Sequence, residues 1–188
     1  MRRAMEIVDK PFFAIPKKSP IAFDLLMTAL ACGKWEEYYN FKAVRLDIDY
    51  IIERCPFLNY IYKYHRFTPG LLRMDPYTYY NWHIDDKRGV SINMLINAHS
   101  ESHCLFSPDP SLTSEFIELP YRPATYYLFN NQVHHSVYNF GRIRYLFSIE
   151  FNETKELLSF STLFKEVLDE FLIEGKPKDE AQRSRKRK

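Results

Sequence analysis

Hydrophobic and polar positions divide the chain into a strand-rich centre with helical segments on both sides. Between residues 71 and 151, short runs rich in aromatic and β-branched residues are separated by Pro, Asn, Asp and Ser, as expected of strands joined by turns. The predicted strands are residues 71–75, 78–84, 90–97, 103–106, 115–119, 125–129, 134–138 and 142–151. About eight short strands favour a barrel or a jelly roll.

Helical spacing of apolar residues appears before and after this centre. Ser19 and the proline after it precede a stretch of helical periodicity, which predicts a helix that ends near Gly33. A short helix is predicted around residues 50–54, where a proline stops it, and residues 57–67 are interpreted as an aromatic strand. The apolar pattern of residues 160–173 predicts a further helix.

We interpret these segments as one domain in four parts. Residues 1–70 would provide N-terminal helical and strand support, 71–151 the β-rich catalytic core, 152–175 a C-terminal helix and 176–188 a basic disordered tail. A chain of 188 residues with 46% hydrophobic and 16% aromatic residues can bury a large core, but it is short for two ordinary domains. A single domain is therefore expected.

The formal net charge of +2 is unevenly distributed. Residues 176–188 hold seven basic side chains against two acidic ones, so the rest of the chain is slightly acidic. The tail could contact nucleic acid or an anionic surface through screened attraction, although a solvated terminus is the simpler interpretation. Any contact with nucleic acid is thus expected through the tail alone.

The three cysteines, Cys32, Cys55 and Cys104, form no CxxC pair and no even-numbered framework. This usage is typical of a reducing intracellular compartment. The sequence also contains no apolar run long enough for a membrane helix and no signal-peptide pattern at its start. We therefore expect a soluble, cytoplasmic protein without a membrane partner.

Two short motifs carry the chemistry. His83 and Asp85 are two residues apart on a predicted strand, so their side chains share one face. A third ligand, His134 or His135, can come from a distant strand if the sheet closes on itself, as in a double-stranded β-helix. Two imidazoles and one carboxylate with open positions form the facial triad that non-haem Fe(II) oxygenases use. The pattern predicts an enzyme.

The order of these motifs resembles that of the Fe(II)/2-oxoglutarate-dependent dioxygenases, above all the hydroxylases related to prolyl and aspartyl/asparaginyl hydroxylases. The resemblance covers about residues 71–151 and rests on HxD at His83, on HxVxN from His135 to Asn139, and on Arg144. It implies a mainly β fold with flanking helices around a double-stranded β-helix, or cupin/jelly-roll, core. It also implies hydroxylation of a C–H bond in a peptide or protein side chain or a free amino acid, with Fe(II), O₂ and 2-oxoglutarate, which is decarboxylated to succinate.

The resemblance assigns the metal to His83, Asp85 and the distal histidine, which are also the expected catalytic residues. We favour His135 as the distal ligand because HxVxN begins there, whereas His134 would give the interval to the arginine that is more common in the family. Neighbouring residues on a strand face opposite sides, so only one of the two histidines can point inward.

Three further residues are expected to bind the cosubstrate. The far carboxylate of 2-oxoglutarate needs a charge-assisted partner, and the planar guanidinium of Arg144 suits that role. Arg142 is the alternative, but it lies beside Gly141 at a predicted hairpin turn, where its side chain is expected to be solvated or to face substrate. Tyr80 and Asn93 could also bond 2-oxoglutarate, although packing explains both equally well.

Two other classes of function remain open. A metal-dependent cupin enzyme that does not use 2-oxoglutarate would need the triad but no buried arginine. A catalytically silent β-helix that serves as a binding module would need neither. For the substrate of an oxygenase, a peptide side chain is the first expectation, a free amino acid or small metabolite the second and a nucleobase the third.

Overall fold

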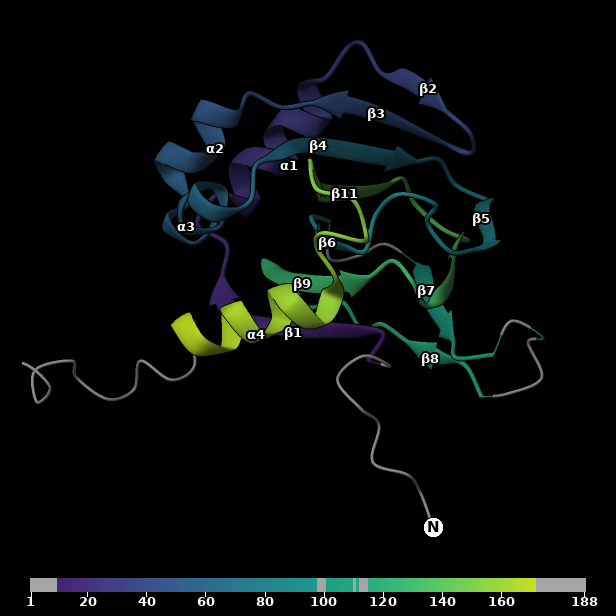
Figure 1. The fold of residues 1–188 in the computed structure, drawn as a ribbon. Helices are drawn as coiled ribbons and strands as arrows, with labels where there is room; N and C mark the ends of the chain where they lie inside the picture. The colour runs from purple at the N-terminus through teal and green to yellow at the C-terminus, as the bar shows by residue number, and fades with distance from the viewer. Residues whose placement is uncertain (1–9, 98–100, 110, 112–114, 172–188) are drawn as a thin grey trace, which may run out of the picture.

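Two antiparallel β-sheets face each other in the computed structural model, which describes residues 10–97, 101–109, 111 and 115–171 (Figure 1). The strands are β1 (Phe12–Lys18), β2 (Glu36–Tyr38), β3 (Phe41–Arg45), β4 (Phe67–Met74), β5 (Thr78–His83), β6 (Val90–Leu95), β7 (Ser102–Ser107), β8 (Ile117–Glu118), β9 (Thr125–Asn130), β10 (His134–Asn139) and β11 (Arg144–Phe151). The helices are α1 (Ala22–Ala31), α2 (Ile48–Arg54), α3 (Pro56–Tyr64) and α4 (Phe160–Phe171).

The larger sheet has seven strands in the order β1-β9-β6-β11-β4-β3-β2, and the smaller has four in the order β5-β10-β7-β8. From β4 onward the chain crosses repeatedly from one sheet to the other, so that strands distant in sequence pair directly. This winding is a double-stranded β-helix, and it confirms the predicted fold class of a mainly β jelly roll with flanking helices. It places β5 and β10, which carry the two histidine motifs, side by side.

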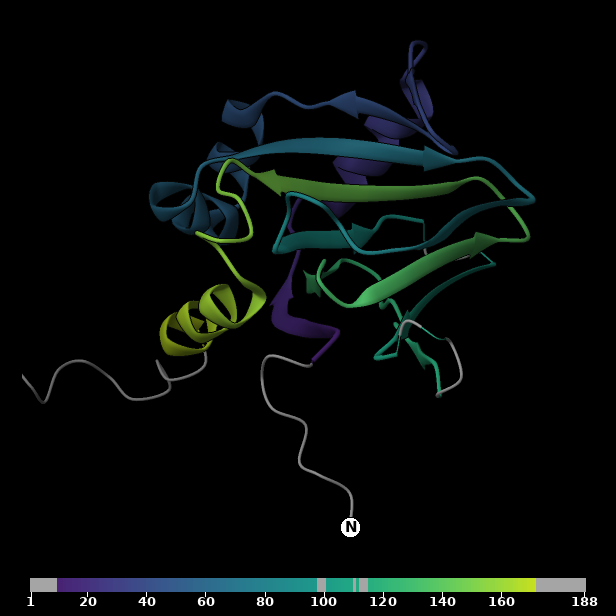
Figure 2. The same ribbon diagram turned by 45° about the vertical axis from the view of Figure 1, so that its right-hand side comes forward.

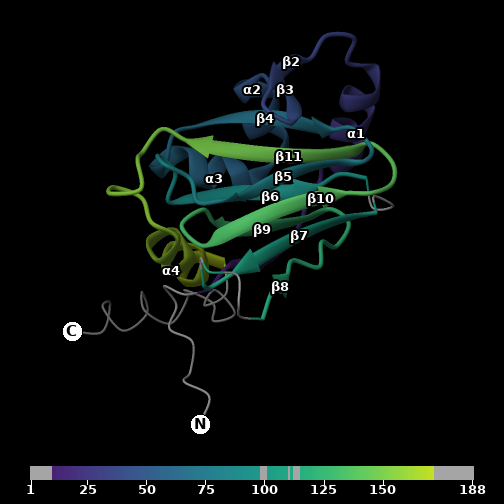
Figure 3. The same cartoon turned by 90° about the vertical axis from the view of Figure 1, so that its right-hand side faces the viewer.

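The four helices pack on the outer face of the seven-stranded sheet (Figures 1 and 2). Their apolar faces join the outward-facing side chains of this sheet, including Phe147 and Ile149, in the main hydrophobic core. Of the described helices, none lies in front of the four-stranded sheet where it faces the viewer in Figure 3. A second, smaller core between the sheets contains Cys104, Phe106, Leu119, Tyr127 and Phe129.

Most predicted elements are found, but the segment from residue 57 to 67 was wrongly interpreted as a strand. It forms α3, and only Phe67 belongs to a strand, at the start of β4. Pro56 occupies the first turn of α3, where its missing N–H costs no hydrogen bond, and Phe57, Leu58 and Ile61 bury one face. The aromatic content suggested a strand, whereas the spacing of the buried residues is helical.

Some expectations fall on parts of the chain that the structure does not describe. The basic tail over residues 176–188 and the end of the helix predicted over 160–173 both extend outside the described residues. Within the described part, no helix is both long enough and apolar enough to cross a membrane.

His65, the residue that caps α3, connects three elements of the outer layer. Its Nδ1 lies 2.9 Å from Oε1 of Glu153, just after β11, and its Nε2 lies 2.7 Å from Oε2 of Glu166 on α4. Burial alone would lower the pKa of His65, but hydrogen bonds and electrostatic attraction from the two carboxylates outweigh burial, so the pKa is raised. The folded protein therefore favours the imidazolium form.

This pair of contacts predicts a pH-dependent contribution to stability. A histidine with a raised pKa in the folded state stabilises fully below its unfolded pKa of about 6.5, and this contribution is lost as the pH rises through the folded-state value. We expect His65→Gln to lower the free energy of unfolding more at about pH 6 than at about pH 9, as measured by urea denaturation. His103→Gln is the control, because His103 and Glu118 form an exposed pair. An equal loss for His65→Gln at both pH values would contradict the prediction.

Candidate active site

A β-bulge in β5 turns the first histidine motif toward the space between the sheets. In the pairing with β10, Tyr80 lies opposite Val137 and His83 lies opposite His135, so β5 contains one residue more than β10 over this interval. On a regular strand, residues three apart would face opposite sides. With the bulge, the rings of Tyr80 and His83 meet at a centroid distance of 4.3 Å.

His83, Asp85 and His135 converge on one point. Each offers one ligand atom, and these atoms lie within 4.8 Å of one another. Asp85 lies just past the end of β5, and its backbone N–H donates to the carbonyl of Asn131 at 3.0 Å. Nε2 of His83 lies 3.7 Å from Oδ1 of Asp85. Three protein ligands on one side of an ion leave the other half of an octahedron open.

Backbone carbonyls determine which imidazole nitrogen is free in each histidine. Nδ1 of His83 lies 2.7 Å from the carbonyl of Asn81, and Nδ1 of His135 lies 2.9 Å from the carbonyl of Val133. Because a carbonyl can only accept, each Nδ1 must carry the proton and donate it. Nε2 of both rings is then left with the lone pair that a metal ion needs.

His135 lies in the drier part of the site. It is 5% exposed, and its ring packs against Phe106 and Phe129 with centroid distances of 5.9 and 4.8 Å. Burial, reinforced by the nearby His83, lowers the pKa of His135 to about 4. The imidazole is therefore neutral at physiological pH and needs to lose no proton to bind a metal.

The neighbouring His134 has a different position. It begins β10, pairs with Ser107 of β7 and faces the side of the strand opposite to His135. Among the described residues, the structure groups His135 and not His134 with His83 and Asp85. The HxVxN motif therefore begins at the histidine that points inward.

Arg144 is a buried cation at the start of β11. It is 5% exposed and shares the inward face of this strand with Ser148, whereas Tyr145 and Phe147 face the helices. Its guanidinium lies 5.7 Å from the centroid of the Tyr121 ring. Within the described residues it forms no ion pair with a carboxylate, and its Nε has no hydrogen-bond partner. An unpaired buried charge is costly, so this position favours an added anion.

The groups beside Arg144 do not supply that negative charge. Burial raises the pKa of the Cys104 thiol to about 12, and burial also raises the pKa of the Tyr121 phenol. Both groups therefore remain neutral next to the guanidinium. Tyr121, Phe106 and Phe129 belong to the same core between the sheets, so Arg144 and His135 border one shared interior.

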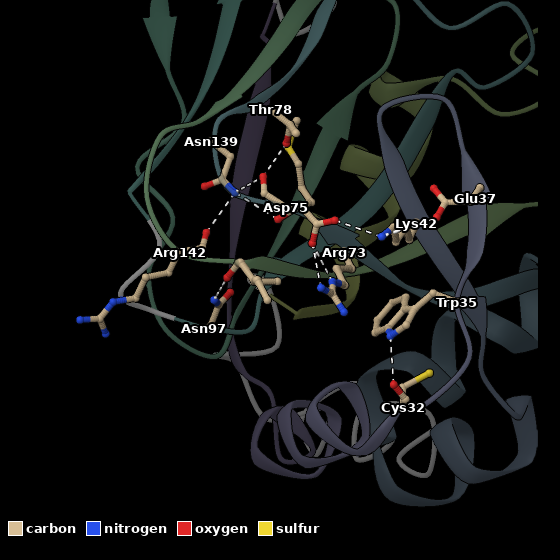
Figure 4. Close-up of polar contacts among 12 residues, drawn as sticks. Cys32, Trp35, Glu37, Lys42, Arg73, Asp75, Thr78, Asn97, Asn139 and Arg142 are labelled. Atoms are coloured by element: carbon tan, nitrogen blue, oxygen red, sulfur yellow. Dashed lines mark hydrogen bonds and ion pairs between the residues drawn. The ribbon is translucent and has the colours of Figure 1, made fainter.

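Arg142 points elsewhere. Its side chain is exposed and extends away from the polar contacts around Asn139 (Figure 4). Asn139 is fully buried, and its amide nitrogen donates to the carbonyls of Met74, Asp75 and Arg142 at 3.1, 2.9 and 3.0 Å. The asparagine of HxVxN thus ties the end of β10 to the connection between β4 and β5 through backbone contacts.

The two weaker candidates face the interior but differ in their partners. Oδ1 of Asn93 accepts a hydrogen bond from Ser148 at 2.7 Å, and its Nδ2 lies 3.3 Å from Oγ of Ser91, so its side chain is held by its own neighbours. Tyr80 packs against His83 and Phe41, and its hydroxyl has no hydrogen bond within the described part of the chain. Burial and the charge of Asp85 raise the pKa of Tyr80.

Two residues beside the site were not identified from the sequence. Asn131, from the turn between β9 and β10, donates a hydrogen bond to Oδ2 of Asp85, and Tyr121 covers the guanidinium of Arg144. Neither belongs to a motif, and their neighbours in sequence carry no distinctive pattern. Their roles depend on pairs of loops that only the folded chain brings together.

Comparison with solved structures identifies the same architecture in several enzymes. A prolyl-4-hydroxylase from Pseudomonas putida is 15% identical, with a TM-score of 0.55 over 76% of this chain and 92% of that one. A prolyl hydroxylase from Trichoplax adhaerens, solved with a peptide of a hypoxia inducible factor oxygen degradation domain, is 11% identical, with a TM-score of 0.55 over 78% and 88%. The non-heme alpha ketoglutarate dependent epimerase SnoN of nogalamycin biosynthesis is 12% identical, with a TM-score of 0.58 over 77% and 79%.

In sequence, no protein-family model and no curated protein matches the chain. At 9 to 16% identity, the structural matches show a shared fold, which is the double-stranded β-helix expected from the motif order. What the fold is used for depends on the residues at its site.

Proposed function

We propose that this protein is an Fe(II)- and 2-oxoglutarate-dependent oxygenase that hydroxylates a C–H bond. The observation that carries the proposal is the pairing of two features in one interior: the open triad of His83, Asp85 and His135, and the buried guanidinium of Arg144, which has no carboxylate partner among the described residues. The similarity in fold to a prolyl hydroxylase and to an alpha ketoglutarate dependent epimerase supports it.

The donor set suits Fe(II). Two neutral imidazoles and one carboxylate on one side of an ion are typical of non-haem iron sites, whereas a structural zinc site would be closed by four ligands. Iron with 2-oxoglutarate and O₂ would supply the oxidising power that a C–H bond requires. The chain's own contribution is to hold the ion at three points, keep the remaining positions accessible and limit water through the rings beside His135.

Arg144 supports 2-oxoglutarate as the cosubstrate. A dicarboxylic oxo acid has one end that can chelate a metal and a second carboxylate that needs a cationic partner away from it. Arg144 offers that partner in a partly dry site, next to groups that stay neutral. The rival function, a cupin enzyme that does not use 2-oxoglutarate, gives no reason to bury this charge, and a silent binding module explains neither feature.

For the substrate, we propose a peptide or protein side chain, with a free amino acid or other small molecule as the second candidate. The hydroxylase from Trichoplax adhaerens that shares the fold was solved with a peptide. SnoN, which also shares it, supports a small molecule. Aerobic incubation with Fe(II), 2-oxoglutarate and either a proteome extract or an amino-acid mixture would identify the substrate by a mass gain of one oxygen atom.

Ligand-dependent stability tests the function without a known substrate. A ligand at about a hundredfold above its dissociation constant stabilises the folded state by about 2.7 kcal/mol, which for a chain of this size raises the melting temperature by roughly 5–10 °C. Under anaerobic conditions, we expect Mn(II) to raise the melting temperature and 2-oxoglutarate to raise it further only when the metal is present. Unchanged melting with either ligand would favour a silent binding module.

A further inference from the structure

The two carboxylate oxygens of Asp85 have different surroundings. Oδ1 faces His83, with 3.7 Å to its Nε2. Oδ2 points the other way, where it lies 2.9 Å from a guanidinium nitrogen of Arg88 and accepts a hydrogen bond from Nδ2 of Asn131. Oδ2 is therefore occupied by two donors, while Oδ1 lies beside a ligand nitrogen of the group that His83, Asp85 and His135 form.

The side chain of Gln132 and one backbone hydrogen bond hold the segments of both donors together. Nε2 of Gln132 donates to the carbonyls of Asp85 and Arg88, each at 2.8 Å. The N–H of Asp85 donates to the carbonyl of Asn131 at 3.0 Å. The segment after β5 and the turn between β9 and β10 are thus bonded to each other on both sides of the carboxylate. These contacts hold Arg88 and Asn131 next to Asp85. An ion pair between mobile surface side chains would not require such supporting hydrogen bonds.

The side-chain amide of Asn131 is buried but only half satisfied by hydrogen bonds. It is 3% exposed, and its Oδ1 is buried with no hydrogen-bond partner in the described part of the chain. Its amide nitrogen must face Asp85, because an amide oxygen would be repelled by the carboxylate. Burying a half-satisfied amide costs stability, and the hydrogen bond that Nδ2 donates to Asp85 is the described side-chain contact that offsets this cost.

We propose that Arg88 and Asn131 are positioning residues that restrict Asp85 to a single oxygen in metal binding. The inference rests on the proposed function. A carboxylate can bind an ion through both oxygens, which here would occupy a fourth position of an octahedron. With Oδ2 engaged by Arg88 and Asn131, the chain would fill three positions, and three would remain available to the oxo acid and O₂.

Arg88→Met tests this assignment with the full-length chain. The side chain of Arg88 is 34% exposed, so its replacement by an unbranched apolar residue is compatible with folding. Under anaerobic conditions, we expect the variant still to bind Co(II), used in place of Fe(II), with a dissociation constant raised by at most about 10–100-fold. We expect its visible absorption spectrum to change, since coordination geometry determines it, and its dissociation constant for 2-oxoglutarate to rise by about tenfold or more.

Two further variants make the result specific. Lys87→Met removes the same charge from an exposed neighbour on the same segment, and we expect the wild-type spectrum and affinity. Arg88→Lys keeps the charge but places it on one nitrogen instead of a planar guanidinium, and it should restore part of the 2-oxoglutarate affinity.

The outcomes separate this inference from the proposed function. A wild-type spectrum and wild-type 2-oxoglutarate affinity in Arg88→Met would overturn the positioning role, and so would loss of Co(II) binding by a folded Arg88→Met protein. Failure of the wild type itself to bind Co(II) or 2-oxoglutarate would contradict the proposed function, and the inference with it.

Discussion

Alanine at His83, Asp85 or His135 should abolish tight binding of Fe(II). Each residue supplies one of three converging ligand atoms, and no other His, Cys, Asp or Glu among the described residues joins this group. Replacement of residues that only orient ligands already costs about 10–100-fold in metal affinity, so loss of a ligand should cost more than about a hundredfold. Anaerobic titration with Fe(II), followed by the metal content of the desalted protein, would measure it.

His134→Ala is the matched control for this result. It removes an imidazole adjacent to His135 in sequence, but from the opposite face of β10. We expect metal binding close to that of the wild type. Stoichiometric iron in His135→Ala, together with its loss in His134→Ala, would transfer the ligand role to His134. Circular dichroism of each variant would show that the fold is retained.

Arg144→Ala should leave metal affinity unchanged and weaken the binding of 2-oxoglutarate. The substitution removes a charge-assisted pair in a partly dry site, a loss of roughly 2–5 kcal/mol. Since each 1.4 kcal/mol is about tenfold, the dissociation constant for 2-oxoglutarate should rise by at least about thirtyfold. Anaerobic titration of the metal-bound variant would measure it.

In the absence of 2-oxoglutarate, replacement of Arg144 by an apolar residue should not destabilise the fold. Arg144 is a buried charge with no carboxylate partner in the described chain, so Arg144→Met should fold at least as stably as the wild type while binding 2-oxoglutarate poorly. Arg142→Ala is the control, since its side chain is exposed. Equal 2-oxoglutarate affinity in the wild type and in both arginine variants would exclude Arg144 as the anchor.

Much of the core could be predicted from the sequence because strand patterns are local. Alternating apolar residues between turn residues located the eight strands of the β-helix, and the two-residue spacing of His83 and Asp85 indicated that their side chains converge. The inward orientation of His135 was reached from its HxVxN context rather than from alternation, because alternation alone is consistent with either histidine.

Other features depend on contacts that a single segment does not reveal. The strands β1, β2 and β3 were not predicted; each is stabilised by pairing with a strand distant in sequence or with a short neighbour. The helix α3 was wrongly predicted as a strand because it contains several tyrosines, which are common in strands. The hydrogen bond from Asn131 to Asp85 and the contact of the Tyr121 ring with the Arg144 guanidinium join separate segments of the chain, so no local pattern indicates them.

The bulge in β5 has a consequence for how this chain can change over time. The extra residue between Tyr80 and His83 sets which side of the sheet every later side chain of β5 faces. Many substitutions at Asn81 or Trp82 would keep that setting, and deletion of either one would leave the histidine two residues after Tyr80, on the same face of a regular strand. Insertion of a further residue, with the one-residue bulge kept, would instead turn His83 to the opposite face. Homologues that retain the site should therefore vary in composition here, and in length only by loss of the bulge residue.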